Sequence, residues 1–87
     1  MEVYLKFFLN YQEKCGREEE TMVFPEEKIN LKTINSRLSE KYDLDIEKVK
    51  QQGIIMLNNK AVNNLEPEQV EIRDGDKIAL MPLVSGG

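Results

Sequence analysis

Residues 74–87 read DGDKIALMPLVSGG, which is a turn, an apolar run, a proline and a double glycine in succession. Gly75 belongs to the turn, because glycine adopts the positive φ angles that tight turns require. The run from Lys77 to Met81 alternates in the manner of a β-strand. Pro82 ends that strand because proline has no backbone N–H to donate. These residues predict that the last strand of a domain leads directly into a C-terminal tail.

The pair Gly86-Gly87 ends the sequence, contributes nothing to a core and carries a high conformational entropy. Two residues without Cβ atoms form a thin tail that can enter a narrow enzyme channel and present its terminal carboxylate. A frayed chain end is the alternative interpretation. We expect a folded domain over residues 1–83 and a flexible tail over residues 84–87.

Two further strands are predicted in the N-terminal part of the chain. Val3, Leu5 and Phe7 alternate with Tyr4, Lys6 and Phe8, which is the pattern of a half-buried strand, and Leu9 can extend the buried set. A second strand is expected over Glu19–Phe24, ended by Pro25. The polar segment Asn10–Cys15 between them fits one short helical turn closed by Gly16.

The strongest helix signal covers Leu31–Tyr42. Its apolar residues are spaced three, four and four apart and form one stripe: Leu31, Ile34, Leu38 and Tyr42. Asn30 precedes the stripe and can cap the helix N-terminus. We expect this stripe to face the hydrophobic core. A further helical turn is compatible with the polar segment Asp43–Gln52.

A hairpin is predicted in the second half of the chain, where Ile54–Leu57 and Ala61–Val62 flank Asn58-Asn59-Lys60. The whole order is then strand, strand, helix, strand, strand, strand. One amphipathic helix can cover one face of one mixed sheet, which is a two-layer α+β domain. We expect the two terminal strands to pair in the centre of that sheet.

Composition limits the kinds of partner. The chain has 87 residues and a net charge of −4, which fits one domain and argues against a nucleic-acid-binding surface. No apolar stretch approaches the roughly 20 residues that span a membrane. No basic segment precedes the apolar N-terminal run, so we expect no signal peptide, no membrane contact and a cytoplasmic location.

The chain contains no histidine and only one cysteine, Cys15. The usual general base, the usual zinc ligands and any internal disulfide are therefore absent from the sequence. Lys14 and Arg17 could lower the pKa of Cys15, but the glutamates at 18–20 oppose them. We expect no autonomous active site, no bound metal and no cofactor bound by this chain.

These features together resemble the MoaD group of ubiquitin-like sulfur carriers, which includes ThiS-type carriers and has a β-grasp fold. The resemblance covers essentially the whole chain, from the strand bearing Phe7-Phe8 and the segment to Gly16, through the hairpin LNNKAV at 57–62. Its most specific part is residues 74–87. The resemblance implies a β-grasp domain over residues 1–83 and a Gly-Gly tail over residues 84–87.

In such carriers a partner enzyme spends ATP to adenylate the terminal glycine, and sulfur then replaces AMP to leave a thiocarboxylate. The resemblance implies that Gly87 becomes the glycyl adenylate and then 1-thioglycine, while Gly86 gives access. It further implies a non-catalytic small subunit and co-substrate of molybdopterin synthase, which builds the dithiolene of molybdopterin. The implied partners are a MoeB-like E1-type adenylating enzyme, a MoaE-like large subunit and a sulfur donor system.

One feature departs from the family pattern, which often has two aromatics and two prolines before the tail. Here the chain reads Leu80-Met81-Pro82-Leu83. Methionine suits adaptable contact surfaces, so a docking surface is compatible with the change. From strand alternation and the resemblance we expect these partner-binding residues: Phe8, Ala61, Met81, Pro82, Val84 and Ser85. Tyr11 and Met56 are weaker candidates for the same surface.

Three alternatives to the molybdopterin pathway remain open from the sequence. A ThiS-like carrier would deliver sulfur to the thiazole of thiamine, although such carriers tend to be shorter. A ubiquitin-like modifier would use the same activated carboxyl of Gly87 to form isopeptide bonds with lysines. An autonomous enzyme is the least favoured reading, because the sequence offers no catalytic pair.

Overall fold

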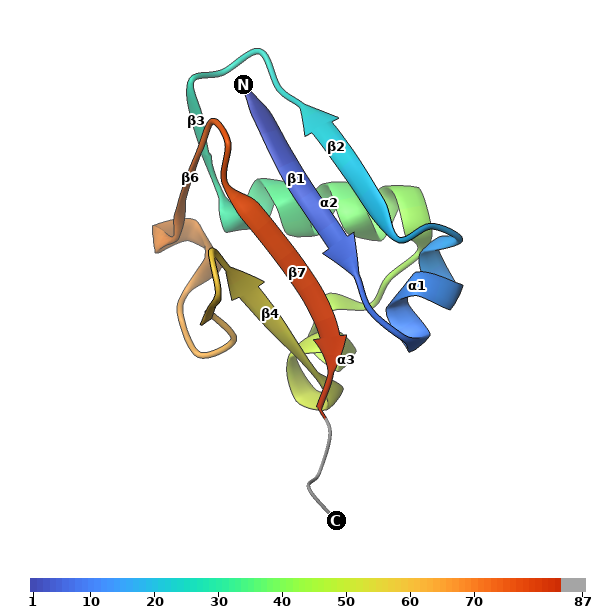
Figure 1. Cartoon of the computed structure of the whole chain (residues 1–87). Helices are drawn as coiled ribbons and strands as arrows, with labels where there is room; N and C mark the ends of the chain where they lie inside the picture. The colour runs from blue at the N-terminus through green and yellow to red at the C-terminus, as the bar shows by residue number, and fades with distance from the viewer. Residues whose placement is uncertain (84–87) are drawn as a thin grey trace.

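The computed structural model describes residues 1–83, which form a five-stranded sheet with a long helix behind it (Figure 1). The order of the strands across the sheet is β2-β1-β7-β4-β5. These strands are β1 (Glu2–Phe7), β2 (Glu19–Val23), β4 (Gly53–Leu57), β5 (Lys60–Ala61) and β7 (Lys77–Pro82). The helices are α1 (Asn10–Cys15), α2 (Leu31–Tyr42), α3 (Ile46–Gln52) and the 3-10 turn η1 (Pro67–Gln69).

The two terminal strands lie side by side in the middle of the sheet, as predicted. β1 pairs in parallel with β7, with Phe7 opposite Leu80, and antiparallel with β2. β4 pairs antiparallel with the other side of β7. Because β1 and β7 are parallel neighbours, their C-terminal ends lie at the same end of the sheet. The chain therefore leaves the sheet beside the end of β1.

The core lies between the sheet and α2. Strand alternation buries Val3, Leu5 and Phe7 from β1 and Ile78 and Leu80 from β7. The helix contributes the predicted stripe, of which Leu31, Ile34 and Leu38 are buried and Tyr42 is partly buried. The expected α+β class, a mixed sheet covered by one main helix, is confirmed.

Local sequence signals account for the ends of these elements. The Asn30 side chain accepts a hydrogen bond from the Thr33 N–H at 3.2 Å and caps α2, as predicted. Gly16 ends α1 with a φ of 72°. Gly75 lies in the turn between β6 and β7 with a φ of 85°. Asn58 and Asn59 have φ values of 49° and 70°, so the predicted hairpin turns as expected, although Lys60 belongs to β5.

A second, two-stranded sheet is not among the sequence predictions. It pairs β3 (Lys28–Asn30) with β6 (Glu71–Arg73), with Ile29 opposite Ile72. Strands of this length are too short for alternation to be visible in a sequence. Over residues 1–83, no helix is long and apolar enough to cross a membrane.

Candidate functional site

The end of β7 fixes the point at which the chain leaves the domain. Pro82 lies opposite Gly53 of β4, so the strand keeps its pairing to its last residue. One residue later, the Leu83 N–H donates to the Gln52 carbonyl at 3.1 Å. The backbone is therefore hydrogen-bonded to its neighbours up to Leu83, and β4 and the end of α3 together hold that residue in place.

A close packing contact supports this exit. Gly53 is buried, and a Cβ atom there would overlap the hydroxyl of Tyr11 and lie 2.9 Å from the Met81 carbonyl oxygen. The missing side chain lets α1 pack against the base of the exit strand. Tyr11 is itself buried, so its prediction as a surface candidate is wrong: its ring supports β4 and β7 from α1. Burial raises the pKa of its hydroxyl.

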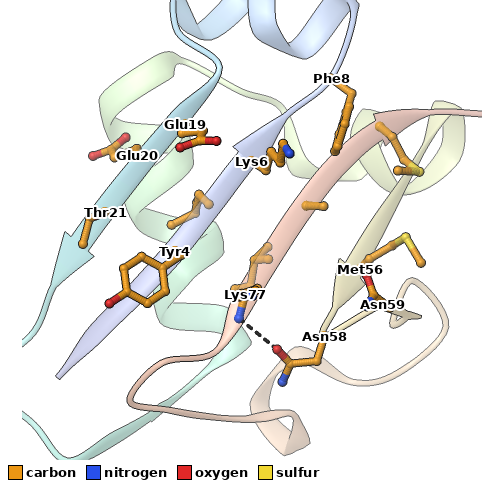
Figure 2. A pocket seen from close by; sticks show the side chains of 14 residues that line it. Tyr4, Lys6, Phe8, Glu19, Glu20, Thr21, Met56, Asn58, Asn59 and Lys77 are labelled. Carbon is orange, nitrogen blue, oxygen red and sulfur yellow. Dashed lines mark hydrogen bonds between the residues drawn. The ribbon is translucent and has the colours of Figure 1, made fainter.

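The outer face of the sheet, opposite α2, carries an open groove of about 650 Å³ (Figure 2). Its half nearest the chain exit is apolar and is lined by Phe8, Ala79, Met81 and Met56. The register explains this gathering, because Ala79 lies opposite Met56 on β4 and the Phe8 N–H donates to the Leu80 carbonyl at 3.0 Å. A partly exposed apolar surface beside a chain exit is suited to contact with another protein.

The other half of the groove is polar, and its charged side chains are the lysines Lys6 and Lys77 and the glutamates Glu19 and Glu20 on β2 (Figure 2). The Lys6 ammonium lies 5.4 Å from the centre of the Phe8 ring, where the two halves meet. The Asn58 side chain accepts from the Lys77 N–H at 3.0 Å and donates to Asp76 at 3.1 Å, which fixes the turn at this end. The groove thus runs from an apolar end at the chain exit to a polar end that carries charges of both signs.

The predicted contact residues divide into three groups. Phe8 and Met81 line the same groove, and Ala61 lies opposite Met56 on the neighbouring strand, exposed at the sheet edge. Pro82 follows Met81 in β7, so alternation turns it away from the outer face. Val84, Ser85, Gly86 and Gly87 lie outside the described residues, and the predictions that concern them stay predictions.

Three residues of this region were not among the predicted contact residues. Lys6 and Lys77 line the groove, and Leu9 lies just beyond β1 with 67% of its surface exposed. The lysines could have been found from the strand alternation that identified Phe8. The alternation of Val3, Leu5 and Phe7 predicts that Leu9 extends the buried set, and this is wrong, because the turn after β1 breaks the alternation and leaves Leu9 exposed.

The titratable residues described by the structure form no catalytic constellation. Cys15 is buried on α1, and burial, assisted by the charge of Glu20, raises the pKa of its thiol to about 11. A thiol of this kind is not a nucleophile at neutral pH. No group of three or more potential metal ligands occurs within residues 1–83.

The sequence and the fold were compared with known proteins. The profile of the ThiS family matches residues 5–87. A comparison with curated protein sequences found no match.

Solved structures share the fold over nearly the whole chain. Small archaeal modifier protein 1 from Methanosarcina acetivorans is 26% identical, with a TM-score of 0.73 and coverage of 99% of this chain and 96% of that chain. The Haloferax volcanii HVO 2177 protein is 25% identical, with a TM-score of 0.72 and coverage of 100% of this chain and 87% of that chain. A chain in the complex of subunits 1 and 2 of molybdopterin-converting factor from Helicobacter pylori is 25% identical, with a TM-score of 0.67 and coverage of 100% and 100%.

Proposed function

The chain belongs to the ThiS family and has the fold of ubiquitin-like sulfur carriers, and from this premise we propose a specific role. We propose that its Gly87 carboxylate is adenylated, converted to a thiocarboxylate, and used as the sulfur donor for the molybdopterin dithiolene. The chain then acts as the small subunit of molybdopterin synthase and as its co-substrate. The likeness to a chain of the Helicobacter pylori complex of molybdopterin-converting factor subunits supports this pathway.

The observation that carries the proposal is the exit of the chain from β7. Pairing with β4 holds the backbone as far as Leu83, and the sequence beyond it is Val84-Ser85-Gly86-Gly87. A fixed exit followed by a short segment ending in two glycines suits a carboxylate that must reach into a partner's active site. The apolar half of the groove beside that exit offers the partner a surface to bind.

The chemistry asks little of the carrier's own side chains. The Gly87 carboxylate oxygen attacks the α-phosphate of ATP in the partner enzyme, and pyrophosphate leaves. A sulfide equivalent from the sulfur donor then attacks the carbonyl carbon, and AMP leaves with its electron pair. The product is the thiocarboxylate, and one proton is released when hydrosulfide is the nucleophile. The partner supplies the metal ion that neutralises the phosphate charges.

Intact-mass measurement tests the proposal. The chain is incubated with ATP, Mg²⁺, sulfide and the E1-type adenylating enzyme from the same genome. We expect a gain of about 16 Da, because one oxygen is replaced by sulfur. Deletion of Gly87 should abolish the gain, while Cys15→Ser should preserve it. Sulfur incorporation that survives the deletion of Gly87, or that requires Cys15, would refute the proposal.

Protein conjugation is the second candidate, and the 26% identity to an archaeal modifier protein favours it. The same activated carboxyl would then form an isopeptide bond with a lysine of a target. Mass spectrometry of cell extract distinguishes the two, because conjugation predicts Gly87 joined to lysine side chains. Delivery to thiamine's thiazole is a third outcome, recognised by which acceptor protein consumes the purified thiocarboxylate.

A further inference from the structure

Leu9 occupies a backbone conformation that leucine rarely adopts. Its φ is 51° and its ψ is −118°. The Tyr11 N–H donates to the Phe8 carbonyl at 3.0 Å, so residues 8–11 form a tight turn with Leu9 at its first central position. These angles are those of a type II′ turn, where glycine dominates because it has no Cβ. For a bulky residue this region of φ and ψ is strained.

The other non-glycine residues with positive φ have an ordinary explanation. Within residues 1–83 they are Asp43, Asn58 and Asn59, whose short polar side chains tolerate the left-handed region. Leu9 is the exception in this described set. Its side chain is also 67% exposed, so packing within the domain does not repay the strain. The chain holds an apolar side chain in water, in a conformation that glycine would adopt at lower cost.

The position of Leu9 suggests what the exposed side chain is for. Leu9 directly follows Phe8, whose N–H donates to the Leu80 carbonyl of β7. Because β1 and β7 are parallel, the turn after β1 and the exit after β7 lie at the same end of the sheet (Figure 1). Leu83, at that exit, is 60% exposed. Leu9 thus lies in sequence between Phe8, which lines the apolar half of the groove, and α1, at the end of the sheet where β7 also ends.

We propose that Leu9 is an anchor of the partner-binding surface, held outward by the strained turn so that it enters an apolar recess beside the tail-binding channel of the adenylating enzyme. The inference rests on the proposed function, because it requires a partner that takes up the tail. The tight turn fixes the backbone before binding, so less conformational freedom is lost on docking. An exposed leucine gains free energy when a partner covers it, because its apolar surface is then removed from water.

Two substitutions separate the strain from the side chain. Leu9→Gly removes both, so it should raise the melting temperature by several degrees while weakening binding to the enzyme. Leu9→Ala removes the side chain but leaves a Cβ at positive φ, so binding should weaken without that rise in melting temperature. Leu65→Ala is the matched control, because Leu65 is a 54% exposed leucine in the loop after β5.

The experiment measures affinity for the purified adenylating enzyme by calorimetry, together with kcat and KM for tail adenylation. We expect both Leu9 variants to raise Kd and KM about 10-fold or more, with kcat nearly unchanged and Leu65→Ala without effect. This opposite movement of stability and affinity in Leu9→Gly is a result that a purely structural role does not produce.

Two results would overturn the inference. Leu9→Gly with wild-type affinity means that the side chain contacts nothing, and Leu9→Gly with a lowered melting temperature means that the turn is not strained. A wild-type chain that binds the enzyme without being adenylated refutes the proposed function but still allows Leu9 to be tested by affinity. A wild-type chain that does not bind refutes both.

Discussion

Cys15 shows how one buried residue responds to the environment around it. Its side chain is 8% exposed, and burial raises the pKa of the thiol from 9.0 to about 11. Folding therefore favours the neutral thiol, and stability linked to this group is present below pH 9. The unfolded chain ionises first as pH rises, so that stability should be lost between about pH 9 and pH 11.

The prediction for Cys15 is checked by urea denaturation at a series of pH values. We expect the free energy of unfolding to fall across this window in the wild type and to fall less in Cys15→Ala. Iodoacetamide at pH 8 should modify the unfolded protein much faster than the folded one. Equal rates of modification would show that the thiol is not protected by the fold.

Gly53 is the residue whose missing side chain matters most for the exit. We expect Gly53→Ala to destabilise the domain by about 1–3 kcal/mol, because the added Cβ overlaps the Tyr11 hydroxyl and crowds the Met81 carbonyl. Adding Tyr11→Phe should recover part of the loss, since it removes the overlapping atom while keeping the ring. Denaturant midpoints measure both effects. A double variant no more stable than Gly53→Ala would mean that the backbone of Met81 sets the cost.

At the scale of the elements, one side chain hydrogen-bonds the start of β4, beyond the residues of β4 that pair with β5. Asn63 accepts from the Ile55 N–H at 2.8 Å and donates to the carbonyls of Gly53 at 2.9 Å and Lys50 at 3.1 Å. These bonds join the end of α3 to the start of β4, where Pro82 pairs. Asn63 therefore braces the element that holds the chain exit, a role that its sequence context did not indicate.

We expect Asn63→Ala to cost about 2–3 kcal/mol of unfolding free energy, because three partly buried backbone groups lose their partner. It should also speed hydrogen exchange at the Leu83 N–H, which bonds to Gln52 beside this brace. Asn64→Ala is the matched control, since Asn64 is exposed, and should stay within about 0.5 kcal/mol of wild type. A similar loss in both variants would contradict the bracing role.

The elements that the sequence predicted are those with a strong local signal. The apolar stripe and the Asn30 cap predicted α2 with its observed bounds. Asn58 and Asn59 predicted the hairpin turn. The sheet of β3 and β6 was missed because its strands hold three residues each and pair far apart in sequence. Such pairing is decided by the tertiary fold, as Ile29 and Ile72 close one end of the core.

Across the whole molecule, the candidate site was predictable where it depends on strand alternation. Alternation and the β-grasp resemblance together placed Phe8 and Met81 on one face, and the groove brings them together. The support by Tyr11 and the strain at Leu9 were not predictable, because both arise from how a short helix meets the end of the sheet. A contact across elements and a φ angle leave no periodic trace in a sequence.

The distribution of charge over the molecule gives a last prediction. The net charge is −4, yet Lys6 and Lys77 lie together on the groove. Neither forms an ion pair with a carboxylate of the described chain, where the salt bridges use Lys28, Lys32, Lys41 and Arg73. Glu19 and Glu20 also line the groove, but on its β2 side, and Glu20 is paired with Lys41 (Figure 2). The charges next to the apolar half are therefore the two lysines, which favour a partner whose facing surface is acidic. Binding to the adenylating enzyme should therefore weaken as salt is added.

Lys6→Glu should lower the association rate with that enzyme by about 3- to 10-fold at low ionic strength and flatten its salt dependence. Lys32→Glu changes the net charge equally but lies on α2, behind the sheet, so its association rate should stay close to wild type. Stopped-flow mixing at several salt concentrations measures both rates. If the two variants slow association equally, the overall charge of the molecule steers the encounter. A loss confined to Lys6→Glu means that the outer face of the sheet is the surface that meets the partner.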